Sequence, residues 1–128
     1  IGLRVRGSVE QIHIVHAEPN SQVSVDGPSG FHREGATDDR GGLIVRDVPA
    51  GSGYIVVVEG HGDTPQEVRV LGPQEHPDAQ FYSSQQLEPT HGFIETRDGT
   101  LLAYRVVLPD PKVYGPGPYD LMVTYSGY

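Results

Sequence analysis

The residue types that carry out covalent chemistry are scattered along this chain, and few of them lie in a recognisable motif. The chain has no cysteine, so it offers neither a disulfide framework nor a thiolate site. It also lacks the G-x-S-x-G sequence that presents a nucleophilic serine on a strained turn. Ser29 lies within Gly27–Gly30, whose composition predicts a turn rather than a catalytic setting. No residue of the chain is therefore identified as a nucleophile.

The histidines are equally dispersed. His13 and His16 are three residues apart in a predicted strand, so they face opposite sides and are not expected to bind one metal together. His61 and Asp63 flank a glycine in a predicted loop, where chance proximity explains the pairing better than a catalytic dyad does.

Three aspartates supply the carboxylate oxygens that Ca²⁺ takes as ligands, namely Asp38, Asp39 and Asp47. They surround a predicted hairpin tip, and a solvated turn is the favoured interpretation. We therefore expect neither a metal nor a cofactor in this chain.

Composition excludes several classes of partner. The net charge is −8, and Lys112 is the single lysine of 128 residues, so the basic patches that bind nucleic acid or anionic membranes are not expected. No apolar run approaches the length that spans a bilayer, and no signal peptide is visible. Ile1 is not a natural start residue, so we expect a processed or trimmed N-terminus. The sequence does not indicate a cellular compartment.

The elements that would position any site are short strands. With 17 Gly and 11 Pro between short runs of β-branched residues, the composition predicts a mainly β fold. Residues 1–72 are predicted to form a small β-sandwich. Turn residues separate five strand signals, at Val9–Val15, Gln22–Asp26, Gly42–Asp47, Gly53–Val58 and Gln66–Leu71.

Alternation within these strands predicts the core. Val23 and Val25 share one face of their strand, and Leu43 and Val45 share one face of theirs. The predicted core comprises Ile12, Ile14, Val45, Tyr54, Val56 and Val58. Residues 73–91 are predicted to be a connector, in which Phe81 and Tyr82 dock the segment onto one of its neighbours.

Residues 92–128 show the strongest pattern. Gly92–Thr96 and Leu101–Leu108 are predicted strands, and Arg97–Thr100 is predicted to be the turn that joins them. A Pro/Gly loop follows. Leu121–Tyr125 is almost continuously apolar, as is typical of a strand buried on both faces.

This last stretch resembles the start of the catalytic domain in the CocE/NonD and X-Pro dipeptidyl-peptidase-like serine hydrolases. The family pattern T-x-D-G-x-x-L-x-x-x-x-x-x-P is matched from Thr96 to Pro109, followed by GPYDLMV and YSGY. Asp120 stands where the family often has Pro. The resemblance implies that 92–128 is the incomplete beginning of an α/β-hydrolase domain, ending before the nucleophile, acid and histidine.

The resemblance also implies one site residue. In the family, a tyrosine just past the third strand donates its hydroxyl to the oxyanion, which corresponds to Tyr128 here. Tyr125 is the alternative if the register differs. The implied substrate is a small ester or peptide, and the implied partner is the remainder of the hydrolase, either in the same polypeptide or as a separate chain.

A second resemblance covers Ala36–Glu59, which is similar to carboxypeptidase-regulatory-like and transthyretin-like sandwiches. The segment ATDDRGGLIVRDVPAGSGYIVVVE carries their T-D-x-x-G and P-x-G patterns, with one extra residue between Gly51 and Tyr54. Such modules are usually accessory. We thus expect a non-catalytic N-terminal portion of a serine hydrolase; the alternative is a stand-alone β-sandwich for binding or adhesion.

Overall fold

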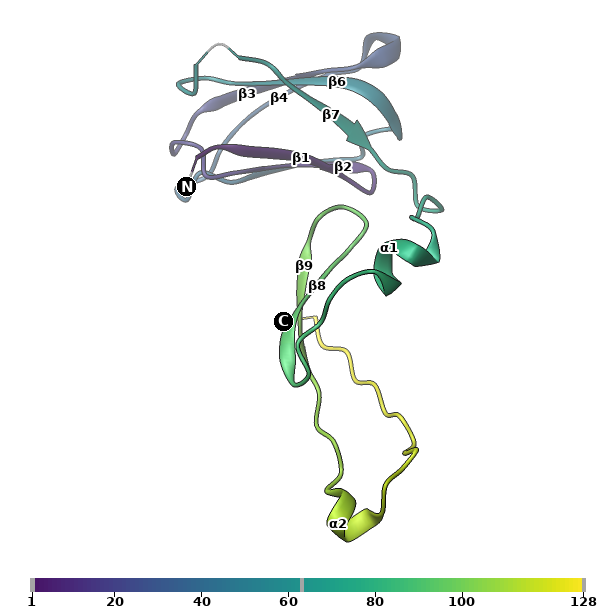
Figure 1. Ribbon diagram of the computed structural model, residues 1–128. Coiled ribbons are helices and arrows are strands. Elements are labelled where there is room, and N and C mark those ends of the chain that lie inside the picture. The colour runs from purple at the N-terminus through teal and green to yellow at the C-terminus, as the bar shows by residue number, and fades with distance from the viewer. Residues whose placement is uncertain (1, 63, 128) are drawn as a thin grey trace.

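The computed structural model in Figure 1 describes residues 2–62 and 64–127. Strands account for 39% of the chain and helices for 10%, which confirms the mainly β prediction. A three-stranded sheet has the order β1 (Arg4–Ser8), β2 (Gln11–Val15), β5 (Leu43–Arg46). A four-stranded sheet has the order β4 (His32–Ala36), β3 (Gln22–Asp26), β6 (Gly51–Val58), β7 (Gln66–Val70). The two antiparallel sheets lie face to face as a sandwich (Figure 1).

Alternating residues of both sheets fill the space between them. The buried hydrophobic residues are Ile12, Ile14, Val23, Val25, Val48, Tyr54, Val56, Val58 and Val70. Five of the six predicted core residues are among them. The sixth, Val45, is half-buried against this core because β5 lies at the edge of its sheet and pairs only with β2.

Two strands were not predicted, and the first predicted strand is too long. The expected strand Val9–Val15 is shortened to β2, because the chain turns at Val9 and Glu10, where Glu10 has φ of 53°. The missed strands are β1, with sequence RVRGS, and β4, with sequence HREGA. Both are edge strands with little apolar alternation. Their extended form depends on hydrogen bonds to the neighbouring strand rather than on a buried face of their own.

A side-chain amide of the connector bonds to the segment that follows it. In α1 (Ala79–Ser83), Phe81 and Tyr82 pack edge to face at 5.0 Å, and Tyr82 remains 42% exposed. The Gln85 side chain bonds both backbone groups of Glu95: its Nε2 donates to the carbonyl and its Oε1 accepts from the N–H, each at 2.9 Å. Gln85 therefore attaches the end of the connector to the hairpin, while Phe81 is half-buried.

A two-stranded hairpin follows the connector. Strands β8 (His91–Glu95) and β9 (Leu101–Arg105) pair in antiparallel register, with Phe93 opposite Ala103. The predicted turn is confirmed, and Gly99 has the positive φ of 82° that such a turn requires. The predicted strand Leu101–Leu108 ends early, at Arg105. A single helical turn, α2 (Pro111–Tyr114), lies at the end of the molecule far from the sandwich (Figure 1).

The predicted buried strand Leu121–Tyr125 is not found. The segment is exposed and is not assigned to any strand among residues 2–62 and 64–127. Apolar side chains alone do not form a strand, because the backbone N–H and C=O groups need partners that no described segment supplies here.

Candidate functional site

The segment Leu121–Tyr125, called the apolar tail below, is the most unusual surface of the molecule. Its apolar side chains are largely exposed to solvent, at 87% for Leu121, 88% for Met122, 78% for Val123 and 80% for Tyr125. Val107 and Leu108, just after β9, are 77% and 72% exposed. Exposed apolar surface of this kind is a candidate site of interaction, because a partner that covers it removes apolar area from water.

The hairpin before the apolar tail has one edge partly blocked and one edge open. Backbone bonds from Thr96 to Thr100 and from Val106 to Thr90 bracket the ladder between β8 and β9. By alternation, the backbone groups of Leu101, Ala103 and Arg105 point away from β8, and no described strand pairs with them. The opposite edge is blocked at Glu95 by Gln85. The open edge of β9 thus offers unpaired backbone groups next to exposed apolar side chains.

The predicted oxyanion residue Tyr128 lies outside the described residues. Its alternative, Tyr125, belongs to the apolar tail and makes no side-chain hydrogen bond within the described part of the chain. Neither tyrosine is therefore tested as an oxyanion donor by this structure.

His13, His32 and His61 make local hydrogen bonds, whereas His16 lies just beyond β2, with a positive φ of 61°, and not in one strand with His13 as predicted. His13 Nε2 lies 2.9 Å from Gln11 Oε1, and His13 Nδ1 lies 3.3 Å from Arg6 Nη2. The pKa of His13 is lowered mainly by burial and secondly by the charge of Arg6. His61 Nε2 accepts the backbone N–H of Glu18 at 2.8 Å, while Asp63 lies outside the described residues. His32 bonds the Asp26 carboxylate at 2.7 Å, and this bond raises its pKa.

The predicted hairpin tip at Asp38 is a turn, but it connects β4 of the four-stranded sheet to β5 of the three-stranded sheet rather than two paired strands. One carboxylate oxygen of Asp38 accepts the backbone N–H groups of Gly42 at 2.8 Å and Arg40 at 2.9 Å, which lowers the pKa of this carboxyl. Asp39 and Asp47 are exposed. Within residues 2–62 and 64–127, no three His, Asp or Glu side chains come together in a way that could hold a metal ion.

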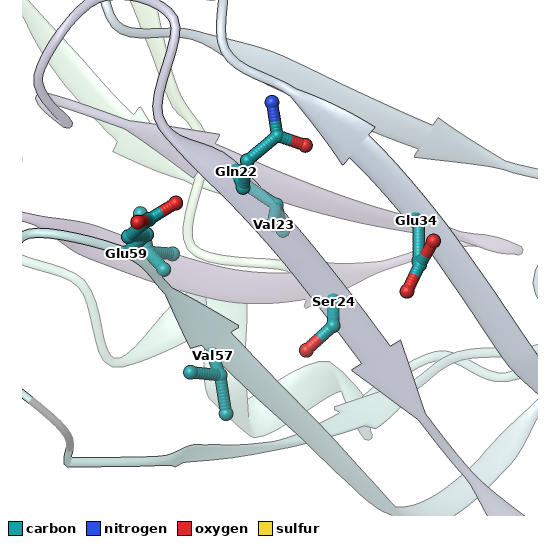
Figure 2. Close-up of a pocket in the computed structure, with 7 residues that line it drawn as sticks. Gln22, Val23, Ser24, Glu34, Val57 and Glu59 are labelled. Carbon is teal, nitrogen blue, oxygen red and sulfur yellow. The ribbon is translucent and has the colours of Figure 1, made fainter.

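A shallow groove of about 370 Å³ crosses the outer face of the four-stranded sheet. Figure 2 shows Gln22 and Ser24 on β3 between Glu34 of β4 and the β6 side, where Val57 and Glu59 lie. The groove is lined by the polar or acidic residues Gln22, Ser24, Glu34 and Glu59 together with three valines, and none of its lining residues is aromatic. The groove can offer hydrogen bonds and negative charge to a ligand, but no ring on which a sugar or a base would stack.

A second hollow, of about 430 Å³, lies where the connector leaves the sandwich. Arg69 pairs with the Glu75 carboxylate at 2.5 Å, and the Gly72 N–H donates to the same carboxylate at 2.7 Å. The Gly72 bond is the main reason that the pKa of Glu75 is lowered. Arg97, from the hairpin turn, reaches the carbonyls of Pro73 at 3.2 Å and Glu75 at 2.6 Å. Both cations thus already have partners within the protein.

The carboxylate of Asp98 joins the hairpin turn to the sandwich. Its Oδ2 accepts the Ser8 hydroxyl at 2.6 Å, and its Oδ1 accepts the Thr96 hydroxyl at 2.9 Å and the Thr100 N–H at 3.0 Å. Partial burial pushes the pKa of Asp98 upward, but these donors outweigh it and hold the pKa well below its ordinary value. A depressed pKa keeps the carboxylate ionised at neutral pH, and its bonds are lost only as the pH falls through the folded-state value.

Sequence reasoning missed this junction. Asp98 was recognised only as a turn residue, and Ser8 lies ninety positions earlier in a strand that was not predicted. No local periodicity signals a contact between residues so far apart.

No protein-family model, curated protein or solved structure matches the chain. Among the residues that the structure describes, no helix is both long enough and apolar enough to cross a membrane.

Proposed function

We propose that this chain is the non-catalytic N-terminal portion of a serine hydrolase of the CocE/NonD and X-Pro dipeptidyl-peptidase-like class. The observation that carries the proposal is the apolar tail, which is exposed and unpaired among the described residues directly after a hairpin with the family's T-x-D-G pattern. A β-rich module stands before that hairpin, in the order that the two sequence resemblances imply.

The partner in this proposal is the remainder of the hydrolase. Its strands would pair with the apolar tail and cover the side chains of Leu121, Met122 and Val123. Pairing would satisfy backbone groups that are costly to bury alone, and burial would remove apolar surface from water. The open edge of β9 is a further place where a strand of the remainder can add to the sheet.

The chemistry in this proposal is acyl transfer from an ester or an amide, including an X-Pro peptide. The remainder of the hydrolase would supply the nucleophilic serine, the histidine and the acid. Tyr128 would donate its hydroxyl to the carbonyl oxygen as negative charge develops there, and the backbone N–H after the nucleophile would be the second donor. The role of this chain is then to position one oxyanion donor.

The test uses the polypeptide translated from the complete reading frame that encodes this chain. We expect a serine-directed fluorophosphonate probe to label one serine within a G-x-S-x-G sequence outside residues 1–128. Tyr128→Phe should lower kcat for p-nitrophenyl acetate by about 10²–10³, the usual effect of removing one oxyanion donor.

Tyr114→Phe is the matched control, because Tyr114 is 72% exposed on α2 and has no role in the proposed chemistry. A loss of activity in Tyr125→Phe but not in Tyr128→Phe would transfer the role to Tyr125. A polypeptide without a probe-reactive serine would refute the hydrolase proposal.

The groove in Figure 2 favours a second candidate, a stand-alone β-sandwich that binds a partner through Glu34, Glu59 and Ser24. Such a module would engage a polar or cationic ligand. A reading frame without a catalytic domain, together with loss of ligand capture in Glu34→Gln, would favour this candidate over the hydrolase.

A further inference from the structure

The sandwich touches the hairpin at the turn. Of the turn residues, Asp98 bonds to the sandwich and Arg97 bonds to the connector. The strands of the hairpin are less protected, since Phe93 and Leu101 are exposed. Figure 1 shows the turn of the hairpin directed at β1 and β2. Two-stranded hairpins are marginally stable in water when isolated. The contacts at the turn are therefore candidates for what keeps this hairpin ordered.

The first contact is made to β1. Ser8 is buried, with 8% of the residue exposed, and its hydroxyl donates to Asp98 Oδ2 at 2.6 Å. Arg6, on the same strand, reaches the Asp98 carbonyl at 3.5 Å. The other carboxylate oxygen of Asp98 holds the turn itself through Thr96 and Thr100. One side chain thus shapes the turn and binds the sandwich.

The second contact is made to the connector. Arg97 donates to the carbonyls of Pro73 and Glu75, while the Glu75 carboxylate is held by Arg69 of β7. Gln85 then closes the other end of the connector onto Glu95. Strand β7, the connector, the turn and β1 are consequently linked in a closed ring, because Leu71, the residue after β7, donates its N–H to the Ser8 carbonyl of β1.

We propose that the sandwich functions as a mount for the hairpin, with Ser8–Asp98 and Arg97–connector as its two fixing points. The mount keeps the hairpin folded and sets the direction in which the chain after β9 leaves the sandwich. This role concerns contacts within the chain, so it holds whether or not the chain belongs to a hydrolase.

The test is amide hydrogen exchange on the full 128-residue chain carrying Ser8→Ala, Arg97→Ala or both. Ser8→Ala removes the first fixing point without altering the turn, which an Asp98 substitution would also disrupt. The amides of Ile94 and Tyr104 report on the hairpin because they belong to its hydrogen-bonded pairs. Val25 and Val56 report on the sandwich core.

We expect exchange at Ile94 and Tyr104 to accelerate about tenfold in each single variant, equivalent to ~1.4 kcal/mol, and further in the double variant. Exchange at Val25 and Val56 should stay unchanged. Residual dipolar couplings of the two parts should fit one alignment tensor in the unsubstituted chain and two different tensors in the double variant.

Matched controls are Ser24→Ala, on the outer face of the sandwich, and Arg105→Ala, on β9, neither of which makes a side-chain hydrogen bond within the described residues. Unchanged hairpin exchange in the double variant would overturn the proposal. Equal acceleration in hairpin and sandwich would also overturn it, since the contacts would then stabilise the whole fold rather than mount one part on another.

Discussion

Tyr54 is the largest side chain in the sandwich core. It is 1% exposed, its ring packs edge to face on Phe31 at 5.4 Å, and its hydroxyl donates to the Pro49 carbonyl at 2.6 Å. A buried tyrosine of this kind combines a large apolar contact with a satisfied polar group. Tyr54 lies on β6, the strand between β3 and β7, where it pairs with Val68 of β7 and the next residue, Ile55, pairs with Asp26 of β3.

Tyr54→Ala should therefore lower the free energy of unfolding by about 3–5 kcal/mol, the range for large buried aromatic residues. Tyr54→Phe keeps the ring and should cost about 1–3 kcal/mol, because the Pro49 carbonyl loses its donor. Urea denaturation followed by far-ultraviolet circular dichroism measures both losses.

Tyr114→Ala provides the comparison, since Tyr114 is 72% exposed and its truncation should change stability by no more than about 0.5 kcal/mol. A loss below about 1 kcal/mol in Tyr54→Ala would contradict the assignment of Tyr54 to the core.

At the scale of the elements, the close approach of β1 to β7 joins the two sheets along one side. Gly7 faces the backbone of β7, and a Cβ built on Gly7 would lie 1.7 Å from the Arg69 carbonyl oxygen. Leu71 donates to the Ser8 carbonyl, and Glu10 donates to the Leu71 carbonyl, each at 2.9 Å. Only a residue without a side chain permits this packing, since the obstructing atom belongs to the backbone.

Gly7→Ala is expected to destabilise the sandwich by at least the ~1–3 kcal/mol of an overpacked core, because β1 or β7 must shift. Thermal unfolding of the variant and of Gly2→Ala measures the effect. Gly2 has nothing within 4 Å of its would-be Cβ, so that control should unfold like the unsubstituted chain. Equal stability of the two variants would show that β1 and β7 are farther apart than the structure places them.

The whole molecule has two regions of different character. Residues up to Val70 enclose a core, whereas the hairpin and the apolar tail expose residues such as Phe93 at 63% and Met122 at 88%. The second region is stabilised by contacts at its turn and by the connector rather than by a core of its own. That difference is the structural basis for proposing a partner at the apolar tail.

Residues 1–128 alone are expected to show no hydrolysis of p-nitrophenyl acetate above background. Nucleophile and base carry most of triad catalysis, and the sequence offers neither in a recognisable setting. The measurement is initial rates with purified chain before and after treatment with a serine-directed inhibitor. Turnover that the inhibitor abolishes would show that a serine of this chain is itself a nucleophile.

The sequence by itself determined the β class, the positions of most turns and the inward faces of the central strands. The bounds of β3 were predicted without error, and Val23 and Val25 are buried as their alternation indicated. These features are local: a period of two residues places side chains on one face, and glycine or proline ends a strand whatever the rest of the chain does.

Only the tertiary structure decided which segments found partners. Strands β1 and β4 form despite weak patterns because β2 and β3 offer them backbone hydrogen bonds. Leu121–Tyr125, with the strongest apolar pattern, pairs with no described strand and stays exposed. The contact between Ser8 and Asp98 likewise depends on how β1 and the hairpin turn meet in space. Pairing requires a second strand at the right distance, and residues far apart in the sequence carry no local signal that they will meet.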